Sequence, residues 1–394
     1  MAVNNKIGKF VASFFELFTR EIKPFSDERI YKNDTDNLYP SRVEAIQRNS
    51  VTAKAASNKL KSFIVGRGFK NKEFNEMVMN PRTGMKGYQL LEKIAKALAT
   101  HRGCFLHVNY DIENKINYVD VLPYKKNRVS KEDSFANAGV IYYKDWEAKE
   151  GFSKESKSCR WFYPFNKDEQ FVNNQRVKDL VEAKAELTPE NMVTQYRGQV
   201  YFLNLDEDDE VYPYAWCDSV MNDCDSEYRI SVYINSGLRK GFLDKTIIVA
   251  NGIDEEDAEE MEDNIKGWLG AENGGDVMTF IPVSPVEDPS KIFTAVQLKS
   301  SYDPEQFENN KVSIANNIRK AYLSIPKILI DPEDSFFGSS GEAFKEAVNY
   351  YNDETLFLRE RIAYMFDKFF DGDFSIQELG ADDLQQQTTR TAVN

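Results

Sequence analysis

The chain contains few of the residues that metal binding and histidine-based catalysis require. Its 394 residues include only two histidines and four cysteines. The cysteines form no C-x-x-C pair, and such sparse usage is typical of proteins from a reducing compartment. His101 and His107 lie six residues apart, whereas two zinc ligands on one helix need a spacing of about four. We therefore expect no metal site and no cofactor.

Long apolar runs, basic blocks and nucleotide-binding motifs are also missing. No run of about eighteen apolar residues occurs, so no membrane-spanning segment is expected. The net charge is −14 and no Lys/Arg-rich block occurs, which argues against a conventional nucleic-acid-binding surface. The sequence contains no G-x-S-x-G, no P-loop and no Rossmann glycine cluster. The best-marked hydrolase, nucleotide-triphosphatase and dehydrogenase signatures are therefore absent.

Acidic pairs leave one enzymatic alternative open. Asp206/Asp208 and Asp223/Asp225 could bind a divalent metal for phosphodiester chemistry. The first pair belongs to the acidic run 206–210, which is more typical of a solvated loop. The second pair lies in an amphipathic helical pattern, in which carboxylates usually face solvent. A protein that is not an enzyme is the favoured interpretation.

The N-terminal half mixes helical and strand patterns. With 41% hydrophobic residues, most of the chain is expected to fold. A stretch rich in Lys, Glu and Ser at 146–158 predicts an exposed loop. Helices are predicted at 6–23, 42–65 and 88–100, and strands at 104–110, 116–122 and 139–143.

The C-terminal half changes to long helices around a small α/β unit. Helices are predicted at 214–242, 254–269 and 303–325, and strands at 245–250, 277–283 and 293–298. Pro326 ends the third of these helices, and a loop at 331–340 leads to the last helix. The tail from Ala381 is polar and is expected to be disordered. The last helix has an apolar stripe formed by Phe344, Val348, Tyr351, Leu358, Ile362, Met365 and Phe369.

Five segments carry the pattern of a known family. In the C-terminal half they are Asn235-Ser-Gly-Leu-Arg-Lys-Gly-Phe242, Ile318-Arg-Lys-Ala-Tyr-Leu-Ser-Ile-Pro326 and Phe337-Gly-Ser-Ser-Gly-Glu-Ala-Phe-Lys345. In the N-terminal half they are Arg102-Gly-Cys-Phe-Leu-His-Val108 and Tyr118-Val-Asp-Val-Leu-Pro123. Together with the order of the predicted elements, these segments resemble the portal proteins of tailed bacteriophages, which form the head-to-tail connector. The resemblance spans roughly residues 42–370 and contains no catalytic signature.

The resemblance implies an α+β fold with the portal order of domains. Residues 1–212 would form a strand-rich wing, 213–243 and 301–326 two stem helices, and 244–300 an α/β clip between them. Residues 327–372 would hold the tunnel loop and a C-terminal wing helix. The remaining residues, 373–394, would form a short crown or a disordered tail.

The implied function is that of a ring-shaped channel at a capsid vertex. The family's plan implies a homo-oligomer, expected to be a dodecamer, through which double-stranded DNA is packaged and ejected. The further partners would be the large terminase packaging ATPase, the major capsid protein and head–tail adaptor proteins. The protein would assemble in the bacterial host cytoplasm and reside in the virion, with no membrane partner. The alternatives are another virion structural protein, such as a minor head or adaptor protein, and a metal-dependent phosphodiesterase.

The stripes of the two long helices supply the candidate site residues. An acidic lumen repels the DNA backbone, whereas a basic one would bind phosphate and slow the DNA. The candidates for the DNA channel are Asp218, Asp225, Arg229, Lys240, Glu305 and Lys320. The candidates for the subunit interface are Cys217, Met221, Tyr228, Phe307, Ile314 and Ile318. The candidates for the tunnel loop are Lys327, Asp331, Glu333, Asp334 and Ser335.

Overall fold

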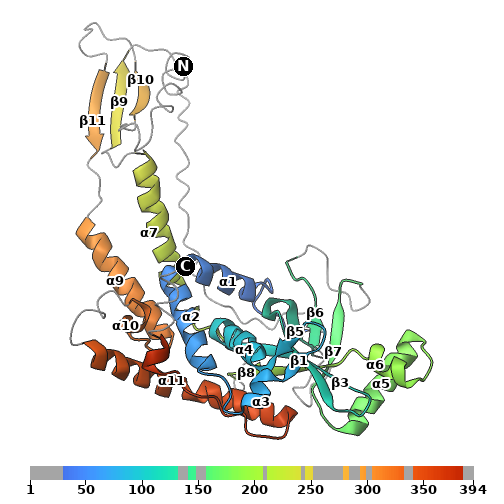
Figure 1. Cartoon of the computed structure of the whole chain (residues 1–394). Coiled ribbons are helices and arrows are strands. Elements are labelled where there is room, and N and C mark those ends of the chain that lie inside the picture. The colour runs from blue at the N-terminus through green and yellow to red at the C-terminus, as the bar shows by residue number, and fades with distance from the viewer. Residues whose placement is uncertain are drawn as a thin grey trace, which may run out of the picture. The chain divides into compact units, whose positions relative to one another are not determined.

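The protein divides into two compact units (Figure 1). The computed structural model describes residues 30–131, 141–147, 157–206, 211–240, 245–251, 278–283, 293–298, 304–331 and 340–384. The larger unit comprises the described parts of residues 1–48, 53–222 and 319–394. The smaller unit comprises 49–52 and the described parts of 223–318. The chain therefore leaves the larger unit and returns to it.

The larger unit contains both helices and strands. Its helices are α1 (Tyr39–Asn49), α2 (Val51–Val65), α3 (Lys72–Glu76), α4 (Gly87–His101), α5 (Glu169–Ala183), α6 (Pro189–Thr194), α10 (Lys327–Ile330) and α11 (Ser340–Phe369), with the 3-10 turns η1 (Tyr124–Lys126) and η2 (Asp218–Val220). Its strands are β1 (Val78–Asn80), β2 (Met85–Lys86), β3 (Gly103–Tyr110), β4 (Ile116–Leu122), β5 (Asn127–Val129), β6 (Ile141–Tyr143), β7 (Arg160–Pro164) and β8 (Gln199–Asn204).

A six-stranded sheet forms the centre of the larger unit. The strand order is β4-β3-β8-β7-β6-β5, and every neighbouring pair is antiparallel except β7 and β8. The predicted strands 104–110 and 116–122 are confirmed as β3 and β4, and 139–143 shortens to β6. The remaining sheet strands β5, β7 and β8 were not predicted, because none shows a clear alternating pattern. One buried cluster on the sheet contains Phe105, Tyr124, Val129, Ile141, Phe162, Val200 and Tyr212.

Helices α2, α4 and α11 form a helical layer in the same unit. The rings of Phe63 on α2 and Tyr351 on α11 meet edge to face at 4.8 Å. Ser57 on α2 donates a hydrogen bond to the carbonyl of Ala99 on α4. Figure 1 accordingly shows α2 between α4 and α11. The apolar stripe predicted for α11 is confirmed as buried from Val348 to Phe369, because these side chains face this layer.

The smaller unit consists of two long helices and a small sheet. Its helices are α7 (Met221–Lys240) and α9 (Pro304–Ala321), and its strands are β9 (Lys245–Asn251), β10 (Met278–Val283) and β11 (Phe293–Leu298). The strand order is β10-β9-β11, with β10 parallel and β11 antiparallel to β9. All three strands were predicted to within one residue. The predicted acidic helix 254–269 lies outside the described residues, as does the predicted helix 6–23.

Two predicted helices are interrupted or shortened. The helix predicted at 42–65 is two helices, which are separated at Ser50. The helix predicted from Tyr214 starts at Met221, after the turn η2. The preceding backbone has other partners, because the N–H of Tyr214 donates to the Asp206 carboxylate and the N–H of Ala215 to the Tyr39 hydroxyl. Helix α2 ends at Val65, and the next residue, Gly66, has a φ of 54°, which is the left-handed conformation typical of a helix C-cap.

The prediction of a disordered tail from Ala381 is wrong for its first residues. Residues 381–384 form a helical turn, and Leu384 is 3% exposed. Upstream, Gln377 donates to the carbonyl of Gly68, and its own carbonyl accepts from Arg67. The backbone approaches Gly66 so closely that a Cβ there would lie 1.9 Å from the Gln377 oxygen. Residues 385–394 lie outside the described residues.

Candidate functional site

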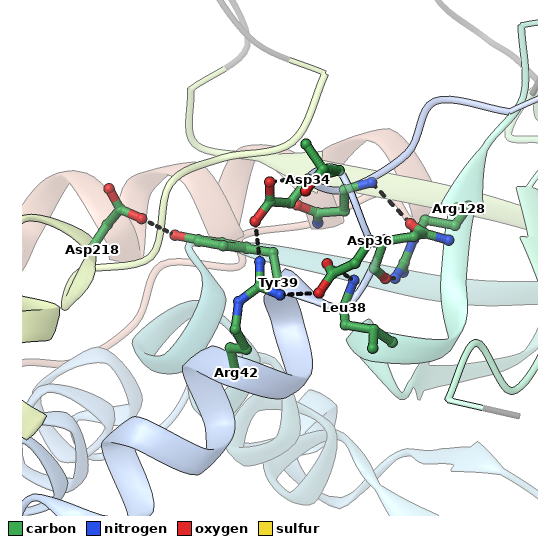
Figure 2. Close-up of polar contacts among 10 residues, drawn as sticks. Asp34, Asp36, Leu38, Tyr39, Arg42, Arg128 and Asp218 are labelled. Atoms are coloured by element: carbon green, nitrogen blue, oxygen red, sulfur yellow. Dashed lines mark hydrogen bonds and ion pairs between the residues drawn. The ribbon is translucent and has the colours of Figure 1, made fainter. Parts of the chain in front are cut away.

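A polar turn before α1 is closed by charged side chains. Asp34 and Asn37 adopt φ angles of 78° and 62°, a left-handed conformation that short polar residues tolerate better than most. Arg42, one turn into α1, forms ion pairs with both Asp34 and Asp36 (Figure 2). Two carboxylates and one guanidinium therefore fix the entry of the chain into α1.

Arg128 joins the same turn to the sheet. Its side chain is 1% exposed and donates to both the side-chain and the backbone oxygen of Asn37 (Figure 2). It also donates to the carbonyls of Asn127 at 2.7 Å and Lys125 at 3.1 Å. Burial lowers the pKa of the Arg128 guanidinium. A buried charge is tolerated only with good hydrogen-bond geometry, so these contacts make the turn a rigid part of the larger unit.

Tyr39 connects α1 to the segment that starts the first long helix. Its hydroxyl donates to Asp218 Oδ1 at 2.5 Å (Figure 2) and accepts the backbone N–H of Ala215 at 3.1 Å. Burial, followed by the negative charge of Asp218, raises the pKa of Tyr39 far above its ordinary value. Asp218 was predicted as a channel residue, yet the structure gives it this anchoring contact within the chain.

Glu227 of α7 caps the N-terminus of α2. Its carboxylate accepts hydrogen bonds from the hydroxyls of Ser50 and Thr52 and from the backbone N–H of Thr52 at 3.2 Å. The first N–H groups of a helix have no partner within the helix, and a carboxylate both satisfies them and opposes the positive end of the helix dipole. The break at Ser50 between α1 and α2 creates this capping site.

The other predicted channel residues occupy the two long helices. Asp225 and Arg229 form an ion pair one turn apart on α7, and Asp225 raises the pKa of Arg229. Lys320, near the end of α9, is exposed. Lys240 is the last residue of α7 and Glu305 the second of α9. Which of them faces DNA stays a prediction.

The predicted interface residues differ in exposure. Cys217 and Ile318 are fully buried and Met221 is 4% exposed, so the chain itself already accounts for their packing. Tyr228 on α7 is 43% exposed and Ile314 on α9 is partly exposed. Phe307 lies in the first turn of α9. A role in a subunit contact stays a prediction for all six, and Tyr228 is the most exposed of the five whose side chains the structure describes.

Two of the five predicted tunnel-loop residues can be placed. Lys327 begins the short helix α10 and is exposed. Asp331 follows that helix, and its backbone N–H donates to the Lys327 carbonyl at 2.9 Å. Glu333, Asp334 and Ser335 lie outside the described residues.

In each acidic pair considered for metal binding, one carboxylate forms an ion pair with an arginine. Asp206 forms an ion pair with Arg102 at 2.7 Å, and Asp225 is paired with Arg229. Asp208 lies outside the described residues. In the part of the chain that the structure describes, no three His, Cys, Asp or Glu side chains are grouped as metal ligands. The helices described there include none that combines the length and the apolarity needed to cross a membrane.

The anchoring residues Tyr39, Arg128 and Glu227 were missed by sequence analysis. Tyr39 and Asp218 are 179 residues apart, and Glu227 and Ser50 are 177 apart. No local pattern connects such positions. The only local signal was the polar composition of the turn that holds Asp34 and Asn37, which are turn formers.

Several solved structures are similar to the chain in fold. One chain in the neck of an empty gene transfer agent particle, computed with C6 symmetry, aligns with a TM-score of 0.50 and 10% identity over 89% of both chains. A chain in the neck of the native particle, computed with C12 symmetry, gives 0.49 and 12% identity over 90% of this chain and 89% of the other. A HK97-family phage portal protein from Corynebacterium diphtheriae gives 0.43 and 9% identity over 83% and 90%.

At such low identity the likeness concerns the fold alone. No protein-family model and no curated protein matches the sequence. The match to the particle-neck chain nevertheless extends over almost the whole length of both chains and includes both units. The resemblance drawn from the sequence is therefore confirmed at the level of the fold, which the chain shares with a chain of the particle neck.

Proposed function

We propose that the chain is a portal subunit, which assembles into a ring and forms a DNA channel at one vertex of a capsid. The observation that carries the proposal is the fold shared with a particle-neck chain over 89% of each chain. Two long helices with a small sheet between them along the chain support the proposal, because the resemblance implies two stem helices on either side of a clip. Packaging, ejection and tail attachment follow from this position in the virion.

In this proposal the larger unit is the wing, α7 and α9 are the stem, and β9–β11 belong to the clip. The large terminase would dock as a separate ATPase, since the sequence has no P-loop. The major capsid protein and the head–tail adaptors would be the other partners. The acidic balance of −14 per chain would keep DNA mobile, because like charges in the lumen oppose adhesion of phosphate.

Single-particle imaging of the purified protein, together with its mass in solution, tests the assembly. We expect a closed ring with an axial hole, built from on the order of twelve chains. A compact monomer at micromolar concentration over a range of salt concentrations would contradict the proposal. A ring without an axial hole would contradict the channel.

Charge reversal in the stem tests the lumen. Asp225→Lys together with Glu305→Lys would add positive charge along the channel, and each phosphate contact raises affinity and its salt dependence, with a slope of about 0.9 per phosphate. We expect the variant to assemble, to package or eject DNA more slowly, and to be more defective at low salt. The matched control reverses the same number of charges at Glu186 and Glu190, two exposed residues next to and in α6. Equal rates for both variants would remove Asp225 and Glu305 from the channel.

A further inference from the structure

A groove with a basic rim lies among α1, α2, α4 and the end of β4 in the larger unit. It has a volume of about 680 Å³. Its apolar floor includes Ala97, Val121, Leu122, Pro123 and Tyr124. The side chains along its rim that carry positive charge are Arg48, Lys54, Lys61, Lys93 and Lys96.

The groove is positive within a strongly acidic chain. Lys61 is 3.6 Å from Glu92 and Lys93 is 2.7 Å from Asp120. Within the described part of the chain, Arg48, Lys54 and Lys96 have no ion-pair partner. The acidic side chain that lines the groove, Glu44, is itself 3.8 Å from Lys125. An excess of positive charge therefore remains for a negatively charged partner.

The outer surface of helix α11 combines aromatic rings with carboxylates, and it also holds Lys368, whose Nζ is 4.7 Å from the centre of the Tyr364 ring. Tyr350, Phe357 and Tyr364 are spaced by seven residues and are 44%, 41% and 57% exposed, so they form one aromatic line along the outer face of the helix. The carboxylates that follow this line at the same spacing of seven are the exposed side chains of Asp353, Glu360 and Asp367. This acidic-aromatic face is opposite the stripe that packs inside the larger unit.

The two surfaces share one repeat distance. Successive carboxylates on α11 are seven residues apart, which is about 10.5 Å along a helix. Lys54 and Lys61, on the groove side of α2, are also seven residues apart and lie on one line of their helix. The aromatic line would face the apolar floor while the carboxylates meet the lysines. Burial of the aromatics would supply affinity, and the charges would set the register.

The two surfaces lie on opposite sides of α2. Phe63, whose ring contacts α11, is nine residues after Lys54, which is about two and a half helical turns. Phe63 and the Lys54/Lys61 line therefore point in opposite directions from α2. The acidic-aromatic face in turn lies on the side of α11 away from α2. One copy of the chain cannot bring its own two surfaces together, but two copies can.

We propose that the acidic-aromatic face of α11 docks in the basic groove of the next copy of the chain. The contact joins two different surfaces, so each copy retains one free surface of each kind until a ring closes. The inference rests on the proposed ring assembly and assigns one of its subunit contacts to named residues.

Reversal of charge and its compensation test the contact in the full-length protein. Lys54→Glu with Lys61→Glu, or Asp353→Lys with Glu360→Lys, should raise the concentration needed for assembly by at least about tenfold. The four changes combined should restore most of the loss, because the signs become complementary again. All four side chains are on the surface, so the protein should still fold, although Lys61→Glu also removes the exposed ion pair with Glu92, which contributes at most about 1 kcal/mol. Circular dichroism checks the folding.

The control and the outcomes separate this contact from the ring itself. Lys178→Glu with Lys184→Glu changes the same charge at exposed positions on and after α5 and should assemble normally. A wild-type ring that tolerates both reversals overturns the contact and leaves the proposed function intact. Loss of assembly without recovery in the combined variant also overturns the contact. A wild-type protein that remains monomeric overturns the proposed function as well.

A disulfide test gives the geometry of the contact. The native cysteines are all buried and free, so Lys61→Cys combined with Glu360→Cys adds a single reactive pair. Oxidation of the assembled variant should give a ladder of trimers, tetramers and larger species on a non-reducing gel. Cross-linking that stops at dimers would indicate a two-fold contact and refute the proposal, and so would a variant that stays monomeric on the gel although it forms rings.

Discussion

Replacement of Tyr39 by Phe should weaken the base of the first long helix. The change removes one hydroxyl that donates to the Asp218 carboxylate and accepts the backbone N–H of Ala215. A hydrogen bond to a charged group contributes about 1.5–3 kcal/mol, and a buried N–H without a partner costs about 1–3 kcal/mol. Because the two losses share one site, we expect the free energy of unfolding to fall by about 2–4 kcal/mol.

The assay is denaturant unfolding followed by tryptophan fluorescence, with Trp216 close to the altered contact. Tyr39 has a raised pKa in the folded protein, so its contribution is fully present below the unfolded-state pKa of about 10 and is lost as the pH rises above it. The difference between wild type and Tyr39→Phe should therefore shrink by about 1 kcal/mol between pH 10 and 11.

Asp218→Asn is the matched control for the charge. Its amide keeps the size of the side chain, and its carbonyl can still accept from Tyr39, so it should cost less than Tyr39→Phe. The double variant should cost less than the sum of the single changes, with a coupling of about 0.5–3 kcal/mol. If Tyr39→Phe unfolds within about 0.5 kcal/mol of wild type, or if the single effects add, the anchoring role of this pair is refuted.

Two further predictions concern the cap and the histidines. Glu227→Ala removes the N-cap contacts of α2 and should lower the free energy of unfolding by about 1–2 kcal/mol, measured as a lower denaturant midpoint. The conservative Glu227→Gln should retain part of this stabilisation. An unchanged midpoint for Glu227→Ala would contradict the cap. Burial lowers the pKa of both His101 and His107, so the folded protein holds both in the neutral form at pH 7. Because the unfolded chain takes up protons first, the free energy of unfolding falls as the pH drops below about 6.5. The loss is at most about 1.4 kcal/mol per pH unit for each histidine. The slope of stability between pH 6.5 and 5 should be smaller in His107→Gln, and an equal slope would refute this.

Elements with a regular pattern could be predicted from the sequence, and elements held by distant contacts could not. The strands β9–β11 are short runs rich in apolar and β-branched residues, and the stripe of α11 repeats apolar residues with the period of a helix, so their positions were visible locally. Strand β8 starts with Gln199, which is fully buried. Its side-chain oxygen is satisfied there by a hydrogen bond from the hydroxyl of Tyr110 on β3, at 2.6 Å. A buried glutamine has no apolar signature, and its partner is 89 residues away.

The candidate site shows the same difference. The polar stripe of the first long helix predicted Asp225 and Arg229 on one face, and their ion pair agrees with that spacing. The same stripe placed Asp218 with them, but η2 precedes the α-helix there, and Tyr39 takes its carboxylate. The groove could not be predicted either, because its cations come from three helices that only the tertiary fold brings together.

The close approach of Gln377 to Gly66 has a consequence for synthesis on the ribosome. Asp383, which pairs with Arg67, is translated 316 residues later, after the whole smaller unit has been made. The larger unit cannot complete its packing on a nascent chain, whereas the smaller unit has all its residues available earlier. Contacts of such high sequence separation form slowly. A chain cut short by interrupted translation would lack this closure, so a cell could discard it by proteolysis before it reached an assembling particle.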